Sequence, residues 1–306
     1  MGTREEAADG RGYPRLRVCL TENWQRPAEK DPMQLMRATL NEAWSLTRCV
    51  VAYPQGFRKV GLHTGKPSGD QSLDTPVLLV HGYGHNSSAW FMLRKALTRA
   101  GFTSVHTMNY NPLIHDIPEI AEKLSNRVEM IRALTGADKV NLVGHSLGGV
   151  VSRWYVQEMD GDLKVNTAIT LSSPHRGTLA ALVPPGRTAR ECRPRSWVIR
   201  RLKADARPTD VRWVAFYGDT DALIQPTRAG RIDEPALNAR NVLVPGMGHM
   251  GMLLSGDVVD QVVEELLRPP APAASLPLFQ RAERLRRAST APTRAAGASR
   301  RRLGIG

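Results

Sequence analysis

The sequence predicts an α/β fold with a mostly parallel central sheet and helices on both of its faces. Between about residues 75 and 268, short apolar runs alternate with longer segments in which apolar residues recur at helical spacing. This alternation is typical of βαβ units and a parallel sheet. The first run, Val77–Val80, is apolar at every position, as expected of a strand that helices cover on both faces.

Six apolar runs are predicted to form strands: Val77–Val80, Val105–Tyr110, Val140–Val143, Val165–Leu171, Val211–Tyr217 and Asn241–Val244. Four segments with helical periodicity are predicted to form helices between them or after them: Ala89–Ala100, Ile117–Leu134, Gly148–Gln157 and Val258–Leu267.

A further amphipathic helix is predicted from Met33 to about Tyr53. Its apolar positions are Met36, Leu40, Ala43, Trp44, Val50 and Val51. We expect this helix to pack on the main domain, and a role at a membrane surface or as a lid is the alternative.

The chain divides into three predicted parts. Residues 1–70 form an N-terminal extension that contains the amphipathic helix, and residues 71–268 form the main, catalytic domain. Residues 269–306 are rich in Pro, Ala and Arg and cannot bury enough apolar surface to offset the entropy of ordering, so we expect a disordered tail.

The net charge of +13 raises the question of an acidic partner. Eight arginines and a single acidic residue, Glu283, give the tail +7 of this charge, so the rest of the chain is only mildly basic. Because no nucleic-acid-binding motif with interleaved aromatic residues is present, we expect no nucleic-acid partner. Weak attraction of the tail to an anionic membrane is the partner that its charge favours.

The three cysteines, Cys19, Cys49 and Cys192, are widely spaced and lack a metal-ligand pattern, so we expect free thiols in a reducing compartment. The sequence shows neither a signal peptide at its start nor an apolar run long enough to span a membrane. We therefore expect a cytoplasmic protein, with peripheral membrane association as the alternative. In the absence of a phosphate loop, a nicotinamide fingerprint or a metal cluster, no cofactor is expected.

The segment Gly144-His145-Ser146-Leu147-Gly148 matches the pattern G-x-S-x-G between a predicted strand and a predicted helix. In that context the pattern indicates a nucleophile elbow, a strained turn that presents a serine at the edge of the sheet. Ser146 is therefore the predicted nucleophile.

A serine needs a neighbouring base, and the base needs an acid that orients it. Asp221 and His249 follow the ends of the last two predicted strands, in the order Ser, Asp, His that this type of elbow favours. We predict that Asp221 is the acid and His249 the base. Asp219, two residues earlier in the same turn, is the alternative acid.

The turn after Val77–Val80 is open and contains glycines, in the sequence "HGYGHNSSAW". Attack on an acyl group produces an oxyanion, which backbone N–H groups stabilise. We predict that Tyr83 and Leu147 supply these two N–H groups. His145 is expected to point away from the substrate, and His81, His85 and His175 are expected to serve as walls of the site or as hydrogen-bonding scaffold.

Several segments resemble the bacterial α/β-hydrolase lipases and esterases, in particular the small triacylglycerol-lipase type. They are "VLLVHGYG", "VNLVGHSLGG", "TLSSPHRGT", "DALIQP" and "GHMGML", in the order of that family. The resemblance implies the α/β-hydrolase fold, the triad Ser146, Asp221 and His249, and the oxyanion hole of Tyr83 and Leu147. Residues 177–210 are rich in Arg and Pro with only a short apolar patch, so any lid that they form is expected to be small.

The function expected from these residues is hydrolysis of carboxylic esters, with an apolar acyl chain, through an acyl-enzyme. An acyltransferase or a thioesterase could use the same triad, because the pocket rather than the nucleophile selects the acceptor. A non-catalytic protein that binds a membrane or nucleic acid through its tail is the alternative of another class.

Overall fold

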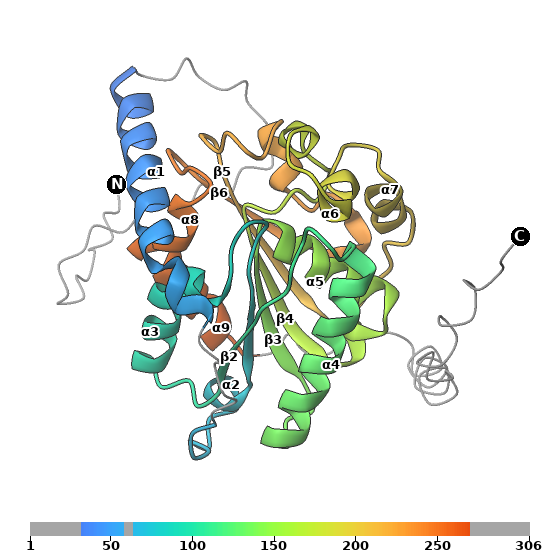
Figure 1. Cartoon of the computed structure of the whole chain (residues 1–306). Coiled ribbons are helices and arrows are strands. Elements are labelled where there is room, and N and C mark those ends of the chain that lie inside the picture. Colours follow the sequence, from blue (N-terminus) through green and yellow to red (C-terminus); the bar gives the residue numbers. More distant parts are fainter. Residues whose placement is uncertain (1–31, 58–63, 270–306) are drawn as a thin grey trace, which may run out of the picture.

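The computed structural model of the chain describes residues 32–57 and 64–269, and these residues form a six-stranded, all-parallel sheet with helices on both faces (Figure 1). The strand order is β2-β1-β3-β4-β5-β6. The strands are β1 (Val77–Val80), β2 (Val105–Met108), β3 (Val140–His145), β4 (Val165–Leu171), β5 (Arg212–Gly218) and β6 (Arg240–Val244). The predicted fold class is confirmed, and all six predicted strands are present.

Two hydrophobic layers separate the sheet from its helices. Leu78 and Val80 face one layer, whereas Val77 and Leu79 face the other, because successive residues of a strand point to opposite faces. All four residues are fully buried, which explains why this strand is apolar at every position.

The long helices were predicted to within two residues at their ends. α4 (Ile117–Thr135) and α5 (Leu147–Glu158) cover one face, and α3 (Phe91–Arg99) and α9 (Gly256–Leu267) cover the other. Local signals define α4 clearly: Asp116 and Glu119 form a capping box at its start, and Gly136 ends it with φ 73°.

The short elements were not predicted, because one or two turns are too short to show a periodic pattern. The short α-helices are α2 (Gln71–Asp74), α6 (Arg187–Glu191), α7 (Trp197–Ala204) and α8 (Gly251–Leu254). The 3-10 helices are η1 (Tyr53–Phe57), η2 (Ser87–Trp90), η3 (Gly161–Leu163), η4 (Leu179–Leu182), η5 (Thr227–Gly230) and η6 (Pro235–Leu237).

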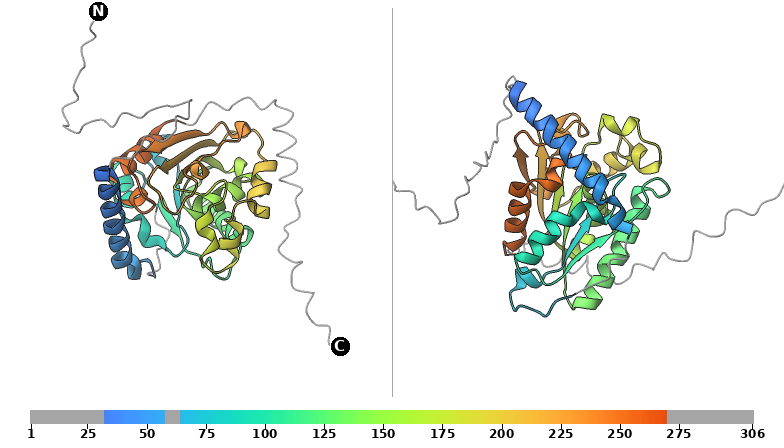
Figure 2. Two further views of the ribbon diagram at one scale, coloured as in Figure 1. Left: turned by 90° about the horizontal axis from the view of Figure 1, so that it is seen from above. Right: turned by 60° about the vertical axis from the view of Figure 1, so that its left-hand side comes forward.

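The predicted N-terminal helix is present as α1 (Pro32–Ala52), on the side of the molecule away from α4 and α5 (Figure 2). Its apolar side faces solvent. Its exposed apolar residues are three, four or seven positions apart and form one stripe, here called the apolar stripe: Met33, Met36, Leu40, Trp44 and Val51. Ser45 and Cys49, which face the main domain, are buried instead. The helix therefore packs on the main domain, as expected, but not through its apolar stripe.

The predicted tail lies outside the described residues from residue 270 onward, as does Cys19. Cys49 and Cys192 are buried free thiols, as predicted for them. Within residues 32–57 and 64–269, none of the helices combines the length and the apolar character that crossing a membrane requires.

Candidate active site

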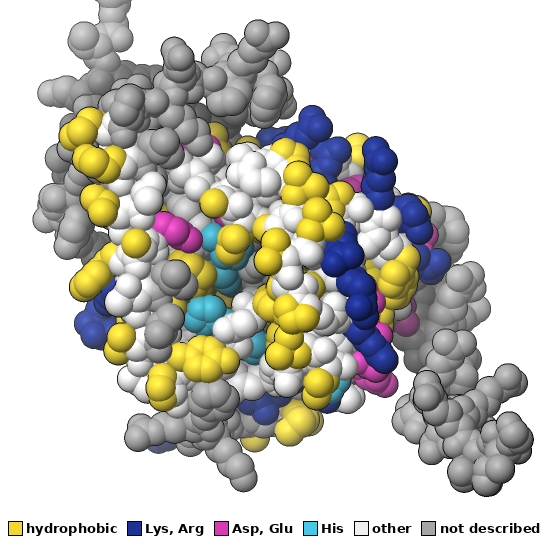
Figure 3. Space-filling model, turned by 45° about the horizontal axis from the view of Figure 1, so that its top comes forward, with side chains coloured by type: hydrophobic (Ala, Val, Ile, Leu, Met, Phe, Trp, Pro, Cys, Tyr) yellow, Lys and Arg dark blue, Asp and Glu magenta, His cyan; other side chains and the backbone are white. Residues whose placement is uncertain are grey.

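The predicted site residues all follow strands at the same edge of the sheet. Tyr83 follows β1, Ser146 follows β3, Asp221 follows β5 and His249 follows β6. Carboxyl ends of parallel strands lie at one edge, which is where open α/β sheets place their ligands. In Figure 3, which views this end, histidine side chains are visible in a hollow surrounded by hydrophobic side chains.

Ser146 has a strained backbone, with φ 53° and ψ −121°. A non-glycine residue in such a conformation costs on the order of 1–3 kcal/mol and persists only where its surroundings enforce it. The N–H of Ser146 donates to the carbonyl of Leu171 at 2.9 Å, which fixes the turn to β4.

The two glycines of the motif are required by close backbone contacts. A Cβ on Gly144 would lie 2.6 Å from the nitrogen of Gly149, and one on Gly148 would lie 2.1 Å from the carbonyl oxygen of Val80. Backbone atoms cannot move aside as the end of a flexible side chain can. The sequence therefore has glycine on both sides of Ser146 because the elbow packs directly on β1 and on the first turn of α5.

His249 and Asp221 form a buried pair. Nδ1 of His249 donates to Oδ2 of Asp221 at 2.9 Å, and Oδ1 of Asp221 accepts from the N–H groups of Leu223 and Ile224. Burial alone would raise the pKa of Asp221, but the charge of His249, its hydrogen bond and the N–H of Ile224 outweigh burial and lower that pKa. Asp221 is thus held as a carboxylate.

Asp219 has a different contact. Its Oδ1 accepts from the N–H of Gly246 at 2.7 Å, at the start of the turn that leads from β6 to His249. The structure therefore brings Asp221, and not Asp219, to the ring of His249.

The two residues predicted to supply the oxyanion donors, Tyr83 and Leu147, both line the pocket beside Ser146. Leu147 is the first residue of α5, so its N–H has no acceptor within the helix. Tyr83 lines the same pocket as Ser146. Gly82 allows this approach, because a Cβ there would lie only 3.0 Å from the Cβ of Ser146.

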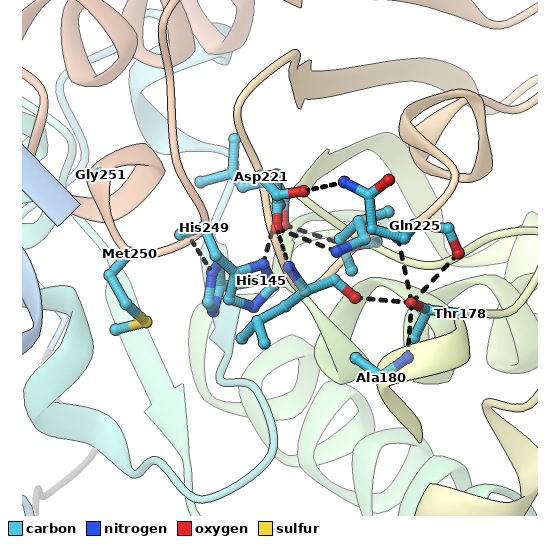
Figure 4. A network of polar contacts seen from close by, with 12 residues as sticks. His145, Thr178, Ala180, Asp221, Gln225, His249, Met250 and Gly251 are labelled. Carbon is cyan, nitrogen blue, oxygen red and sulfur yellow. Dashed lines mark hydrogen bonds and ion pairs between the residues drawn. The ribbon is translucent and has the colours of Figure 1, made fainter. Parts of the chain in front are cut away.

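His145 was expected to point away from the substrate, but its ring packs against His249, with the ring centres 4.7 Å apart (Figure 4). Its Nε2 donates to the carbonyl oxygen of His249 at 3.1 Å. The neighbour of the nucleophile therefore supports the His249 turn. Burial, followed by the charge of His249, lowers the pKa of His145 well below its usual value, so this ring is neutral near pH 7.

Three further histidines, His81, His85 and His175, were expected to be walls of the site or hydrogen-bonding scaffold. His85 lines the pocket, while His81 stacks on Tyr110 at 4.1 Å between ring centres. His175 is buried with its Nε2 at 2.9 Å from Oγ1 of Thr170.

A pocket of about 850 Å³ opens beside Ser146 and His249. Most of its lining is apolar, including Leu223, Ile224 and Val183. This lining belongs largely to residues 177–210, the predicted small lid, and to the turn after β5.

Polar contacts attach this lid segment to the site. The hydroxyl of Tyr83 donates to the carbonyl of Pro185 at 2.6 Å. Thr178 donates to the carbonyl of Leu223 and accepts from the N–H of Gln225, whose side chain donates to the carbonyl of Asp221 (Figure 4). The lid segment is thus bonded to the turn that carries the acid.

Glu42 of α1 also lines the pocket, and sequence reasoning missed it. Its contacts are with Met250 and Gly251, 208 and 209 positions away in the chain. Nothing local in the sequence marks a glutamate for such a contact.

Three comparisons with known proteins bear on this site. The family model for palmitoyl protein thioesterase matches residues 76–210. Triacylglycerol lipases from Pseudarthrobacter phenanthrenivorans and Burkholderia plantarii are each 35% identical over 111 residues, which is 34% of this chain. The match spans about a third of the length of these relatives, 34% and 30%.

Solved structures show the same fold. The mature Bacillus licheniformis lipase BlEst2 superposes with a TM-score of 0.55 at 17% identity, over 68% of this chain and 98% of that one. Aspergillus fumigatus lipase B gives 0.54 at 19% identity, over 70% and 58%. At such identities the likeness concerns the fold alone.

Proposed function

Because the chain belongs to the lipase and esterase group of the α/β-hydrolase family, we propose that it hydrolyses carboxylic esters at Ser146. The observation that carries this proposal is the combination, around one pocket, of a strained serine turn and the hydrogen-bonded pair of His249 and Asp221.

In the proposed reaction, Oγ of Ser146 attacks the ester carbonyl while His249 accepts the hydroxyl proton. The carboxylate of Asp221 holds the ring and stabilises its positive charge. The N–H groups of Tyr83 and Leu147 stabilise the oxyanion. His249 then protonates the leaving alcohol, and the C–O bond to that alcohol breaks to leave an acyl-enzyme. Water, deprotonated by His249, attacks the acyl-enzyme and releases the acid and free Ser146.

The proposed substrate is an ester with an apolar acyl chain. The apolar lining and the volume of about 850 Å³ support this proposal, since a pocket of that size can bury a ligand as large as a typical drug molecule. The names of the similar triacylglycerol lipases point in the same direction.

Hydrolysis of a p-nitrophenyl ester series of increasing chain length tests the proposal. The wild-type protein should be active, and Ser146→Ala should lose at least about 10³-fold in kcat. Ser72→Ala, in the short helix α2 that precedes β1, is the control and should match the wild type. Failure of a fluorophosphonate to label Ser146 in folded protein would rule out the proposed nucleophile.

Thioester hydrolysis is the second candidate, and the match to the palmitoyl protein thioesterase model favours it. The same serine and base serve both reactions, so the test must compare leaving groups. We would measure kcat/KM for an oxygen ester and a thioester that carry the same acyl chain. A thioester is chemically more reactive than an oxygen ester, so some increase in kcat/KM is expected for any hydrolase. An increase well beyond that difference in reactivity would favour the second candidate.

A further inference from the structure

The carboxylate of Glu42 holds the backbone of the turn that carries His249. Oε1 of Glu42 accepts from the N–H of Met250 at 2.7 Å, and Oε2 accepts from the N–H of Gly251 at 3.0 Å. These two amides directly follow His249 in the chain. A single side chain of α1 therefore binds two consecutive backbone donors next to the proposed base.

The turn leaves room for this carboxylate on the other side of His249 as well. A Cβ on Gly248 would lie 2.3 Å from Oε2 of Glu42, so no other residue fits at position 248 without displacing the carboxylate. Glu42 thus contacts the backbone both before and after His249.

The contact between Glu42 and the His249 turn helps to account for the orientation of α1. The hydrophobic effect favours burial of the apolar stripe, yet the stripe faces solvent and the side with Glu42, Ser45 and Cys49 faces the main domain. Hydrogen bonds from backbone amides to a carboxylate are stronger than those between neutral groups. The two bonds to Glu42 are therefore one attachment of the helix to the main domain, beside the buried Cys49 and the contact of Arg48 with the ring of Phe91.

Other groups hold the remainder of the turn. Asp219 binds the N–H of Gly246 at its start, and His145 binds the carbonyl of His249 in its middle. Glu42 holds the end of the turn, at Met250 and Gly251. A base that transfers protons must be held closely in place, because a displacement of about 1 Å can cost about 100-fold in rate.

We infer that Glu42 is a positioning residue that fixes His249 through the backbone of residues 248–251. This inference rests on the proposed function, in which His249 is the base. Glu42 takes no part in the reaction itself.

Glu42→Gln tests the inference, because glutamine keeps the size of the side chain but its amide nitrogen cannot accept a hydrogen bond. Glu122→Gln is the matched control, since Glu122 is exposed on α4. Active sites would be counted by fluorophosphonate titration, and turnover of a short soluble ester would be expressed per active site. We expect kcat per site of Glu42→Gln to fall about 10- to 100-fold with little change in KM, and the control to match the wild type.

A purely structural role predicts another result. Glu42→Gln would then have fewer active sites or a lower melting temperature, but each remaining site would work at the wild-type rate. A rate per site within about twofold of the wild type would overturn the inference. Glu42→Asp keeps two acceptor oxygens on a shorter side chain, so its rate should lie between those of the wild type and Glu42→Gln.

Hydrogen exchange gives a readout that does not depend on activity. The amides of Met250 and Gly251 should exchange faster in Glu42→Gln than in the wild type, and unchanged exchange would overturn the inference. If wild-type protein neither hydrolyses esters nor reacts with the fluorophosphonate, the proposed function fails. The exchange measurement would still decide whether Glu42 holds the turn.

Discussion

Two aspartates only two positions apart contact different parts of the site. Asp221 is hydrogen-bonded to the ring of His249, whereas Asp219 binds the backbone of Gly246. Both lie in the turn after β5, so spacing alone left both open as the acid. The hydrogen bonds distinguish the two: Asp221 contacts the proposed base itself, whereas Asp219 contacts the turn that carries the base.

Substitution of each aspartate by asparagine should give unequal effects. Asp221→Asn removes the charge that orients His249 and stabilises its protonated form, so kcat for a soluble ester should fall by about 10⁴-fold. Asp219→Asn keeps an oxygen that can accept from Gly246, so its kcat should stay within about threefold of the wild type. Steady-state kinetics on the two purified variants decides the matter. The reverse order of effects would make Asp219 the acid.

At the scale of an element, α6 carries a glutamate whose ionisation opposes the packing of the lid segment. Oε2 of Glu191 accepts from the N–H of Ile117 at 2.7 Å, at the first turn of α4. Burial, aided by the charges of Asp116 and Glu119, raises the pKa of Glu191 to about 7. Arg187 lies 3.7–3.8 Å from those two acids and partly offsets them.

Stability should therefore depend on pH through Glu191. Between about pH 4.5 and 7 the folded protein keeps a proton that the unfolded chain has lost, so the free energy of unfolding falls as pH rises through this window. Glu191→Gln cannot ionise. Relative to the wild type, its melting temperature should rise by roughly 5–10 °C between pH 5 and pH 8, since each pH unit below 7 contributes about 1.4 kcal/mol.

Thermal unfolding at several pH values measures this difference. Glu264→Gln, which changes an exposed glutamate of α9, is the control and should follow the wild type at every pH. A constant difference between Glu191→Gln and the wild type from pH 5 to pH 8 would contradict the expected ionisation.

The exposure of the apolar stripe on α1 leads to a separate prediction about stability. Leu40 is 62% exposed, so Leu40→Ala should change the free energy of unfolding by no more than about 0.5 kcal/mol. Leu97 of α3 is fully buried, and Leu97→Ala should cost about 2–5 kcal/mol. Urea unfolding of both variants provides the comparison. A loss of similar size at both positions would mean that the apolar stripe is buried in solution.

For the whole molecule, the sequence predicted the fold best where a strand is buried on both faces of the sheet, because such burial leaves a local apolar pattern. The strands from Val77 and Val165 were predicted to the residue. The first is apolar without interruption, as expected of a parallel strand that helices cover on both faces. The turn at Ser146 was equally clear, since its flanking glycines are required by backbone contacts within a few residues or with the adjacent strand.

What could not be predicted depends on contacts between distant segments. The periodicity of α1 shows which of its faces is apolar, but not which face is buried, so the exposure of Trp44 could not be predicted. Glu42 and Thr178 act through partners that lie far away in the chain. The role of Asp221 stays a prediction, supported by its bond to His249.

The order of the site residues along the chain also matters while the protein is being made. Ser146 follows the third strand, but His249 follows the last one, at the edge of the sheet. Synthesis proceeds from the N-terminus, so a growing chain on the ribosome presents the serine turn before the strand that carries its base exists. Such an unfinished chain can assemble most of the parallel sheet and still lack the means to activate the serine. If Ser146 is the nucleophile that we propose, its base reaches it only when β6 joins β5.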